Sequence, residues 1–147
     1  MKYEQALSRA AALCSQSEQC ESQITEKLRR WETSEADIAR IIAYLYDENY
    51  LDTARFCRAF VSDKLRQNHW GRLKIRMALR QLRLPEADIE QALQVDDEEY
   101  AEILRHVLAA KARTLRDTDS YVRRTKLLRH AASRGFEAEV IFDLLPE

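Results

Sequence analysis

The chain has 147 residues, of which 33% are charged and 46% hydrophobic, and its formal net charge is −1. Only 2 Gly and 2 Pro occur, which argues against a β sandwich or barrel with frequent tight turns and leaves no glycine-rich loop for a phosphate. This balance is too apolar for a disordered chain and is typical of amphipathic helices.

Apolar residues recur at helical spacing along almost the whole chain. Ser34 and Asp52 stand where helix N-caps are expected, and Pro85 suits the first turn of the helix that follows it. Asn49 and Gly135 can take the left-handed conformation that ends a helix. The expected helices cover residues 2–16, 20–31, 34–47, 52–67, 71–83, 85–94, 96–114, 119–133 and 137–145.

The helical pattern repeats along the chain. Ile24 lies 51 residues before Ile75, which lies 52 residues before Leu127, and SEADI at 34–38 recurs as PEADI at 85–89. We therefore predict an all-α fold in which three tandem three-helix repeats form an elongated, curved array. The same intervals relate Leu28, Leu79 and Ala131, then Ile38, Ile89 and Ile141, then Ile42, Leu93 and Leu145. The expected repeats are residues 1–50, 51–95 and 96–147.

Basic residues gather in two stretches of the chain. From Lys64 to Arg83 there are 7 basic residues and no acidic one, and from Arg105 to Arg134 there are 9 basic residues against two aspartates. A row of cations on one helix face suits a phosphate backbone or an acidic protein surface, although a solvated face has the same pattern. The predicted ridges are Arg72, Arg76, Arg80 and Arg83 on one helix, and Arg123, Lys126 and His130, followed by Arg134, on the repeat-equivalent helix.

Trp70 precedes the first ridge, and two roles are open for it. An exposed ring could stack on a base or anchor in a partner, and a buried ring would pin its loop to the core. The full set of candidate partner- or nucleic-acid-binding residues is Lys64, Arg66, Trp70, Arg72, Lys74, Arg76, Arg80, Arg83, Lys111, Arg113, Arg123, Arg124, Lys126 and Arg129.

Nothing in the sequence indicates catalysis, a metal site or a cofactor. The cysteines and histidines lack the spacing of metal ligands, and nucleophile motifs are missing. We interpret Cys14, Cys20 and Cys57 as small apolar packing residues. Six aromatic residues are assigned to core or inter-repeat packing: Trp31, Tyr44, Tyr46, Tyr50, Phe56 and Phe60.

The sequence favours a cytoplasmic protein. It contains no run of about 18 apolar residues to cross a membrane, and its N-terminus lacks the apolar core of a signal peptide. An odd number of cysteines, 3, predicts reduced thiols.

The central segment, residues 48–93, resembles the RecX family of bacterial RecA regulators. The match rests on Tyr50-Leu51-Asp52, Arg55-Phe56, Phe60-Val61, Gly71, Ile75, Leu79 and the L-P-E-x-x-I-x-x-A-L run at 84–93. RGFEAEVI at 134–141 resembles the signature of the family's last repeat, so the resemblance extends from about Ala6 to Leu145.

The resemblance implies three tandem three-helix units and a cytosolic protein that binds RecA nucleoprotein filaments. Family members dampen the ATPase, strand-exchange and coprotease activities of RecA, by lying in the filament groove or by blocking filament growth, and many also bind DNA. Asn49 stands where the family usually has Gly, Thr53 replaces a usual acidic residue and Leu84 replaces a Gly-Ile type of turn. The net charge of −1, against the basic character of many relatives, favours filament binding over strong independent DNA binding.

Two other functions are compatible with the sequence. Three-helix units also suit a helix-turn-helix DNA-binding regulator, although no dimer interface is evident. A helical-repeat adaptor for another protein has the same periodicity. We expect a monomer that regulates RecA in recombination, DNA repair and the SOS response, most plainly by inhibition.

Overall fold

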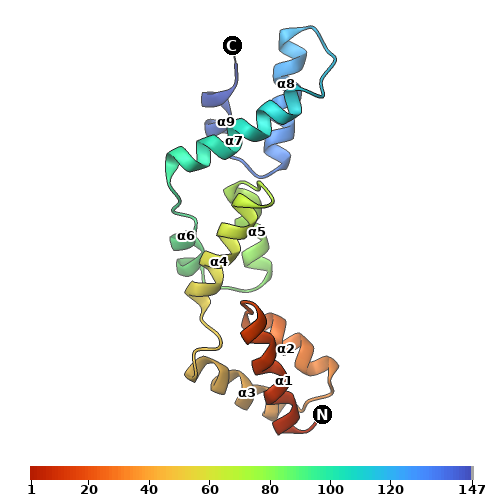
Figure 1. Cartoon of the computed structure of the whole chain (residues 1–147), viewed down its shortest axis with the longest axis vertical. Coiled ribbons are helices and arrows are strands. Elements are labelled where there is room, and N and C mark those ends of the chain that lie inside the picture. The colour runs from red at the N-terminus through yellow and green to blue at the C-terminus, as the bar shows by residue number, and fades with distance from the viewer. Residues whose placement is uncertain (147) are drawn as a thin grey trace.

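The computed structural model describes residues 1–146. Within them the chain forms nine helices and no strand, which confirms the all-α prediction (Figure 1). No helix end differs from its predicted position by more than two residues. The helices are α1 (Tyr3–Gln16), α2 (Glu21–Arg30), α3 (Glu35–Asp47), α4 (Thr53–Arg66), α5 (Arg72–Gln81), α6 (Glu86–Ala92), α7 (Asp97–Ala112), α8 (Ser120–Ser133) and α9 (Ala138–Leu144).

Local signals fix where the helices begin and end. The side chains of Ser34 and Asp52 accept hydrogen bonds from backbone N–H groups of the first turns of α3 and α4. Asn49 and Gly135 have φ of 61° and 96°, so both take the predicted left-handed conformation. Pro85 lies one position earlier than predicted, at the N-cap of α6 rather than in its first turn.

The helices form three units, α1–α3, α4–α6 and α7–α9, which follow one another along the long axis of the molecule (Figure 1). Of the twelve positions related by the sequence repeat, eleven are buried and Ile42 is half-buried. The repeat therefore marks the residues that fill each unit, as predicted. The boundaries at 50/51 and 95/96 stay a prediction.

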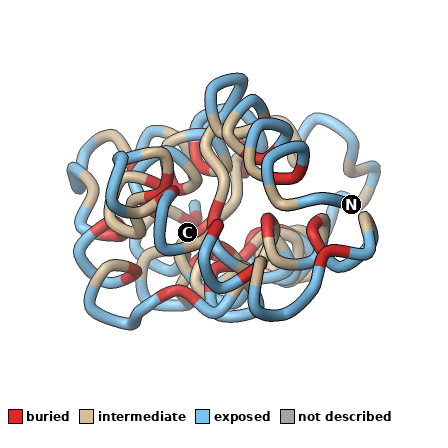
Figure 2. Tube along the Cα trace, turned by 90° about the horizontal axis from the view of Figure 1, so that it is seen from below, coloured by how far each residue is buried: buried red, intermediate tan, exposed pale blue. Residues whose placement is uncertain are grey.

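The described residues contain two hydrophobic clusters. One fills the first unit, and the other runs continuously through the second and third units. Buried residues occur along the chain in short stretches between half-buried and exposed ones (Figure 2). Two side chains next to the boundary between the first and second units pack into the cluster of the other unit. Cys20, which precedes α2, belongs to the cluster of the second unit, and Leu51, which precedes α4, belongs to that of the first.

The cysteines and most aromatic residues pack as predicted. Cys20 and Cys57 are buried and Cys14 is half-buried, all as free thiols. Burial raises the pKa of Cys57 to about 11, with a further contribution from Asp88. Tyr44 differs from the prediction, because its side chain is 40% exposed and rests on the ring of Tyr50.

Candidate interaction surfaces

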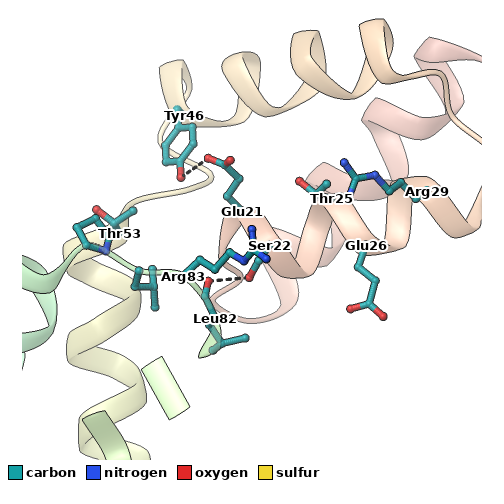
Figure 3. A pocket seen from close by; sticks show the side chains of 11 residues that line it. Glu21, Ser22, Thr25, Glu26, Arg29, Tyr46, Thr53, Leu82 and Arg83 are labelled. Carbon is teal, nitrogen blue, oxygen red and sulfur yellow. Dashed lines mark hydrogen bonds between the residues drawn. The ribbon is translucent and has the colours of Figure 1, made fainter. Parts of the chain in front are cut away.

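One kind of contact recurs at both places where neighbouring units meet. The first turn of a unit's second helix lies against the left-handed turn before the last helix of the next unit. At the first junction Ser22 Oγ donates a hydrogen bond to the Leu82 carbonyl over 2.8 Å (Figure 3). At the second junction the N–H of Gly71 donates to the Arg134 carbonyl over 2.8 Å, and that of Leu73 to Gly135 over 2.9 Å. We call these junction 1–2 and junction 2–3.

Arg72 belongs to junction 2–3 rather than to the open surface. Its guanidinium lies over the ring of Tyr100, 3.9 Å from the centroid, and donates to Glu137 over 2.9 Å and to the Leu93 carbonyl over 3.1 Å. The Tyr100 hydroxyl donates to the same carboxylate. Burial alone would raise the pKa of Glu137, but the hydrogen bonds from Tyr100, the backbone and Arg72 outweigh it and lower the pKa.

Two more arginines of the first predicted ridge, Arg76 and Arg80, are tied to α6. Arg76 Nε lies 2.8 Å from Glu90, and Arg80 Nε lies 2.7 Å from Glu86. The ridge is therefore not an open row of cations, because helix α6 brings its acids alongside α5. Of its four arginines, Arg83 alone has neither an ion pair nor a side-chain hydrogen bond to residues 1–146.

The second predicted ridge is also largely engaged within the protein. Arg123 donates to the carbonyls of Ala112, Leu115 and Asp117, and so holds the loop between α7 and α8. Lys126 Nζ lies 2.7 Å from Asp117. Four further cations of the basic stretches have partners: Arg66 with Glu99, Arg105 with Glu98 and Glu102, Arg124 with the Pro146 carbonyl, and Arg134 with the Asn68 carbonyl.

Three predicted cations of the second basic stretch have no such partners among the described residues. Within residues 1–146, Lys111, Arg113 and Arg129 make no ion pair and donate no side-chain hydrogen bond. Lys111 and Arg129 line a hollow of about 280 Å³ between α7 and α8, together with Lys126 and His130. Burial lowers the pKa of His130, and the charges of Lys111 and Arg134 lower it further, so the hollow already favours anions with the imidazole neutral.

Junction 1–2 carries a groove of about 510 Å³, shown in Figure 3. Its lining mixes polar, charged and apolar residues: Ser22, Glu26 and Arg29 from α2 lie opposite Arg83, Leu84 and Pro85 of the second unit. The predicted candidate Arg83 is thus exposed at the rim of a mixed-charge groove, away from the other unpartnered cations.

Junction 2–3 carries a second groove, of about 450 Å³, and its lining is mostly apolar. Leu73 and Met77 of α5 project into it beside Trp70, and Lys64 and Lys74 hold their ammonium groups 5.0 and 4.5 Å from the centroid of the Trp70 ring. Trp70 is half-buried against the core, so it both pins its loop and lines a surface. Sequence reasoning missed Leu73 and Met77, although their i, i+4 spacing opposite the buried face was a readable signal.

Neither a metal site nor a membrane span is found in the part of the chain that the structure describes. These residues hold no group of three or more His, Cys, Asp or Glu side chains arranged to bind a metal ion. None of their helices is long and apolar enough to cross a membrane.

Comparison with known proteins finds relatives and family models that match almost the whole chain. Models of the first, second and third three-helix domains of RecX match residues 6–45, 52–93 and 97–145. The chain is 32% identical to regulatory protein RecX of Prosthecochloris aestuarii over 142 residues, which cover 97% of this chain and 92% of that protein. It is 27% identical to regulatory protein RecX of Clostridium acetobutylicum over an alignment of 150 residues, which covers 99% of this chain and 69% of that protein.

Solved structures show the same fold. A crystal structure of a regulatory protein RecX superposes with a TM-score of 0.88 at 26% identity and covers 97% of this chain and 72% of its own. RecX from Lactobacillus salivarius superposes with a TM-score of 0.86 at 17% identity, covering 97% and 93%. Together with the domain matches, these likenesses establish that the chain belongs to the RecX family of regulatory proteins.

Proposed function

We propose that this chain binds RecA nucleoprotein filaments and lowers the ATPase, strand-exchange and coprotease activities of RecA. The observation that carries the proposal is the likeness to a regulatory RecX protein over 97% of the chain at 32% identity. The three units in a row give an elongated molecule (Figure 1), and such a shape offers contacts to several subunits of a filament at once.

The binding cations we favour are those that fold contacts leave available. Arg83, Lys111, Arg113 and Arg129 lack intramolecular side-chain partners among the described residues, whereas Arg72, Arg76 and Arg80 are held by acids of the same chain. Reversing the charge of the latter three would disturb junction 2–3 and the α5–α6 packing. It is therefore a poor test of binding, because a loss of binding could come from a disturbed fold.

The test is the single-strand-dependent ATPase of the cognate RecA, titrated with this protein. Inhibition well below one copy per RecA would indicate blocked filament growth, and inhibition only near saturation would indicate coating of the groove. An unchanged ATPase with folded, helical protein would contradict the proposal and favour an adaptor for another protein.

A weaker contact with DNA is favoured by the hollow between α7 and α8. Lys111, Lys126, Arg129 and His130 line it, and phosphate oxygens are natural ligands for such a group. A Lys111→Ala, Arg129→Ala double variant should bind single-stranded DNA more weakly and with a smaller salt dependence, by titration with a labelled oligonucleotide. A clear preference for one duplex sequence would instead favour a helix-turn-helix regulator.

A further inference from the structure

The apolar groove at junction 2–3 exposes large hydrophobic side chains that the fold does not use. Met77 is 62% exposed and Leu73 is 45% exposed, and both lie on the outer side of α5, whose inner side buries Ile75 and Leu79. Ala132 and Ser133 at the end of α8 form the opposite wall. Exposed apolar side chains gathered in a hollow mark an interaction site more often than singly scattered ones do.

The other two units show that this apolar character is not needed for folding. Ser22 and Glu26 in α2 are the repeat equivalents of Leu73 and Met77, and in α8 the equivalent residues are Thr125 and Arg129. All three units adopt the same fold with different residues at these positions. The apolar pair is therefore a property of this one surface.

Charge around the groove points to the kind of partner. Lys64 and Lys74 both lie over the Trp70 ring, and no carboxylate within the described chain lines the groove. A base that stacked on Trp70 would have to displace a lysine from the ring. An apolar side chain can instead rest on Leu73 and Met77 while a neighbouring carboxylate meets a lysine.

We propose that this groove docks an amphipathic segment of RecA in which apolar side chains are flanked by carboxylates. The inference rests on the proposed function and assigns a surface and a partner chemistry to it. The apolar side chains would fill the hollow between α5 and the end of α8, as an amphipathic segment fills a hydrophobic groove. Lys74 and Lys64 would pair with the flanking acids.

The test gives this groove the polar character of the equivalent positions in the first unit. A Leu73→Ser, Met77→Glu double variant should bind preformed RecA filaments on oligo(dT) at least about tenfold more weakly, measured by fluorescence anisotropy of the labelled protein. Its thermal midpoint should stay close to that of the wild type, because both side chains are exposed. Tyr121→Glu is the matched control: this side chain is 76% exposed at the start of α8, and the same apolar-to-acid change there should leave filament binding unchanged.

Other outcomes separate the competing explanations. Wild-type affinity in the double variant, or an equal loss in Tyr121→Glu, would overturn the groove assignment while leaving filament binding intact. An equal loss of binding to bare oligo(dT) would overturn it in favour of a nucleic-acid surface. Wild-type protein that does not bind filaments at all would overturn the proposed function, and this inference with it.

A second variant tests the acidic character of the partner. Lys74→Gln keeps the side-chain stem and removes the charge, so filament binding should weaken several-fold and depend less on salt. An unchanged affinity and salt dependence would overturn the assignment of carboxylates to the docked segment.

Discussion

Junction 1–2 and junction 2–3 have the same geometry but different chemistry. At junction 1–2 the contact is made through side chains: Cys20 enters the core of the second unit, and the Ser22 hydroxyl reaches the Leu82 carbonyl. At junction 2–3 the equivalent of Cys20 is Gly71, which has no side chain, and the backbone at Gly71 and Leu73 is hydrogen-bonded directly to the backbone at Arg134 and Gly135. The first unit keeps its own core, whereas the second and third share one.

Because of this difference, we expect the two ends of the molecule to differ in their stability against local unfolding. The second and third units are joined by backbone hydrogen bonds, a shared core and the Arg72–Tyr100–Glu137 cluster, so we expect them to unfold together. The first unit has its own core, and among the described residues no backbone–backbone hydrogen bond joins α1–α3 to α4–α6. We expect it to open at a lower free energy than the other two.

The largest expected effect comes from adding a side-chain atom to Gly71, where the backbones of the second and third units touch. In Gly71→Ala the added Cβ would overlap the Gly135 carbonyl group, which cannot move without shifting the turn. We expect a loss of about 3 kcal/mol or more in the free energy of unfolding, measured with urea. Cys20→Ala, the equivalent position at junction 1–2, should lose only about 1 kcal/mol. Equal losses would contradict the contrast between the junctions.

The next effect comes from removing the cation that bridges junction 2–3. Arg72→Leu leaves the Glu137 carboxylate, which is 29% exposed, without its ion pair. Loss of one partner from a largely buried pair should lower the free energy of unfolding by about 2 kcal/mol, because the remaining charge still has to be desolvated. Urea unfolding measures this loss, and wild-type stability in the variant would show that Tyr100 and the backbone suffice to hold the carboxylate.

Acid should loosen the same junction. The pKa of Glu137 lies below its ordinary value of 4.5 in the folded protein, so the ionised form stabilises the fold and this stabilisation is present above that value. It is lost as the pH falls through the folded pKa. Urea midpoints measured between about pH 5 and pH 3 should therefore fall, and Glu137→Gln should make that fall shallower. The same slope in both proteins would assign the acid sensitivity to other carboxylates.

A smaller and more local effect is expected at junction 1–2. Ser22→Ala removes the hydroxyl that donates to the Leu82 carbonyl, at a cost of about 1 kcal/mol for a half-buried hydrogen bond. Because the first unit has its own core, amide exchange should accelerate in α1–α3 and stay unchanged in α7–α9. Uniform acceleration along the chain would mean that all three units open as one.

Sequence patterns predicted the helices and the repeat because both depend on local spacing. Ile75 and Leu79 are buried where the periodicity placed them, and the left-handed turns fall at Asn49 and Gly135. The ridge on α5 was different: one helix shows where Arg72 and Arg80 point, but not which acids the next helix brings to them. Since Arg72 meets Glu137, 65 residues away, its partner depends on how two units dock.

One of these ion pairs did leave a trace in the sequence. Arg29–Glu35 in the first unit and Arg80–Glu86 in the second have the same spacing of six residues and the same repeat offset. Both link the last turn of a second helix to the first turn of the third. The recurrence of Arg and Glu at equivalent positions of two units is therefore a signal, readable in the sequence itself, that Arg80 makes a fold contact.

The smallest effects should come from the exposed pairs, which sharpens the contrast with Arg72. The side chains of Arg29 and Glu35 are 61% and 71% exposed, and those of Arg80 and Glu86 are 52% and 59% exposed. Water screens such pairs, and holding two long side chains in one geometry offsets the attraction. Arg29→Gln and Arg80→Gln should therefore leave the urea midpoint within experimental error, even at low salt. A loss at Arg80 but not at Arg29 would mean that junction 2–3 extends its influence along α5, since the two pairs are otherwise the same contact in neighbouring units.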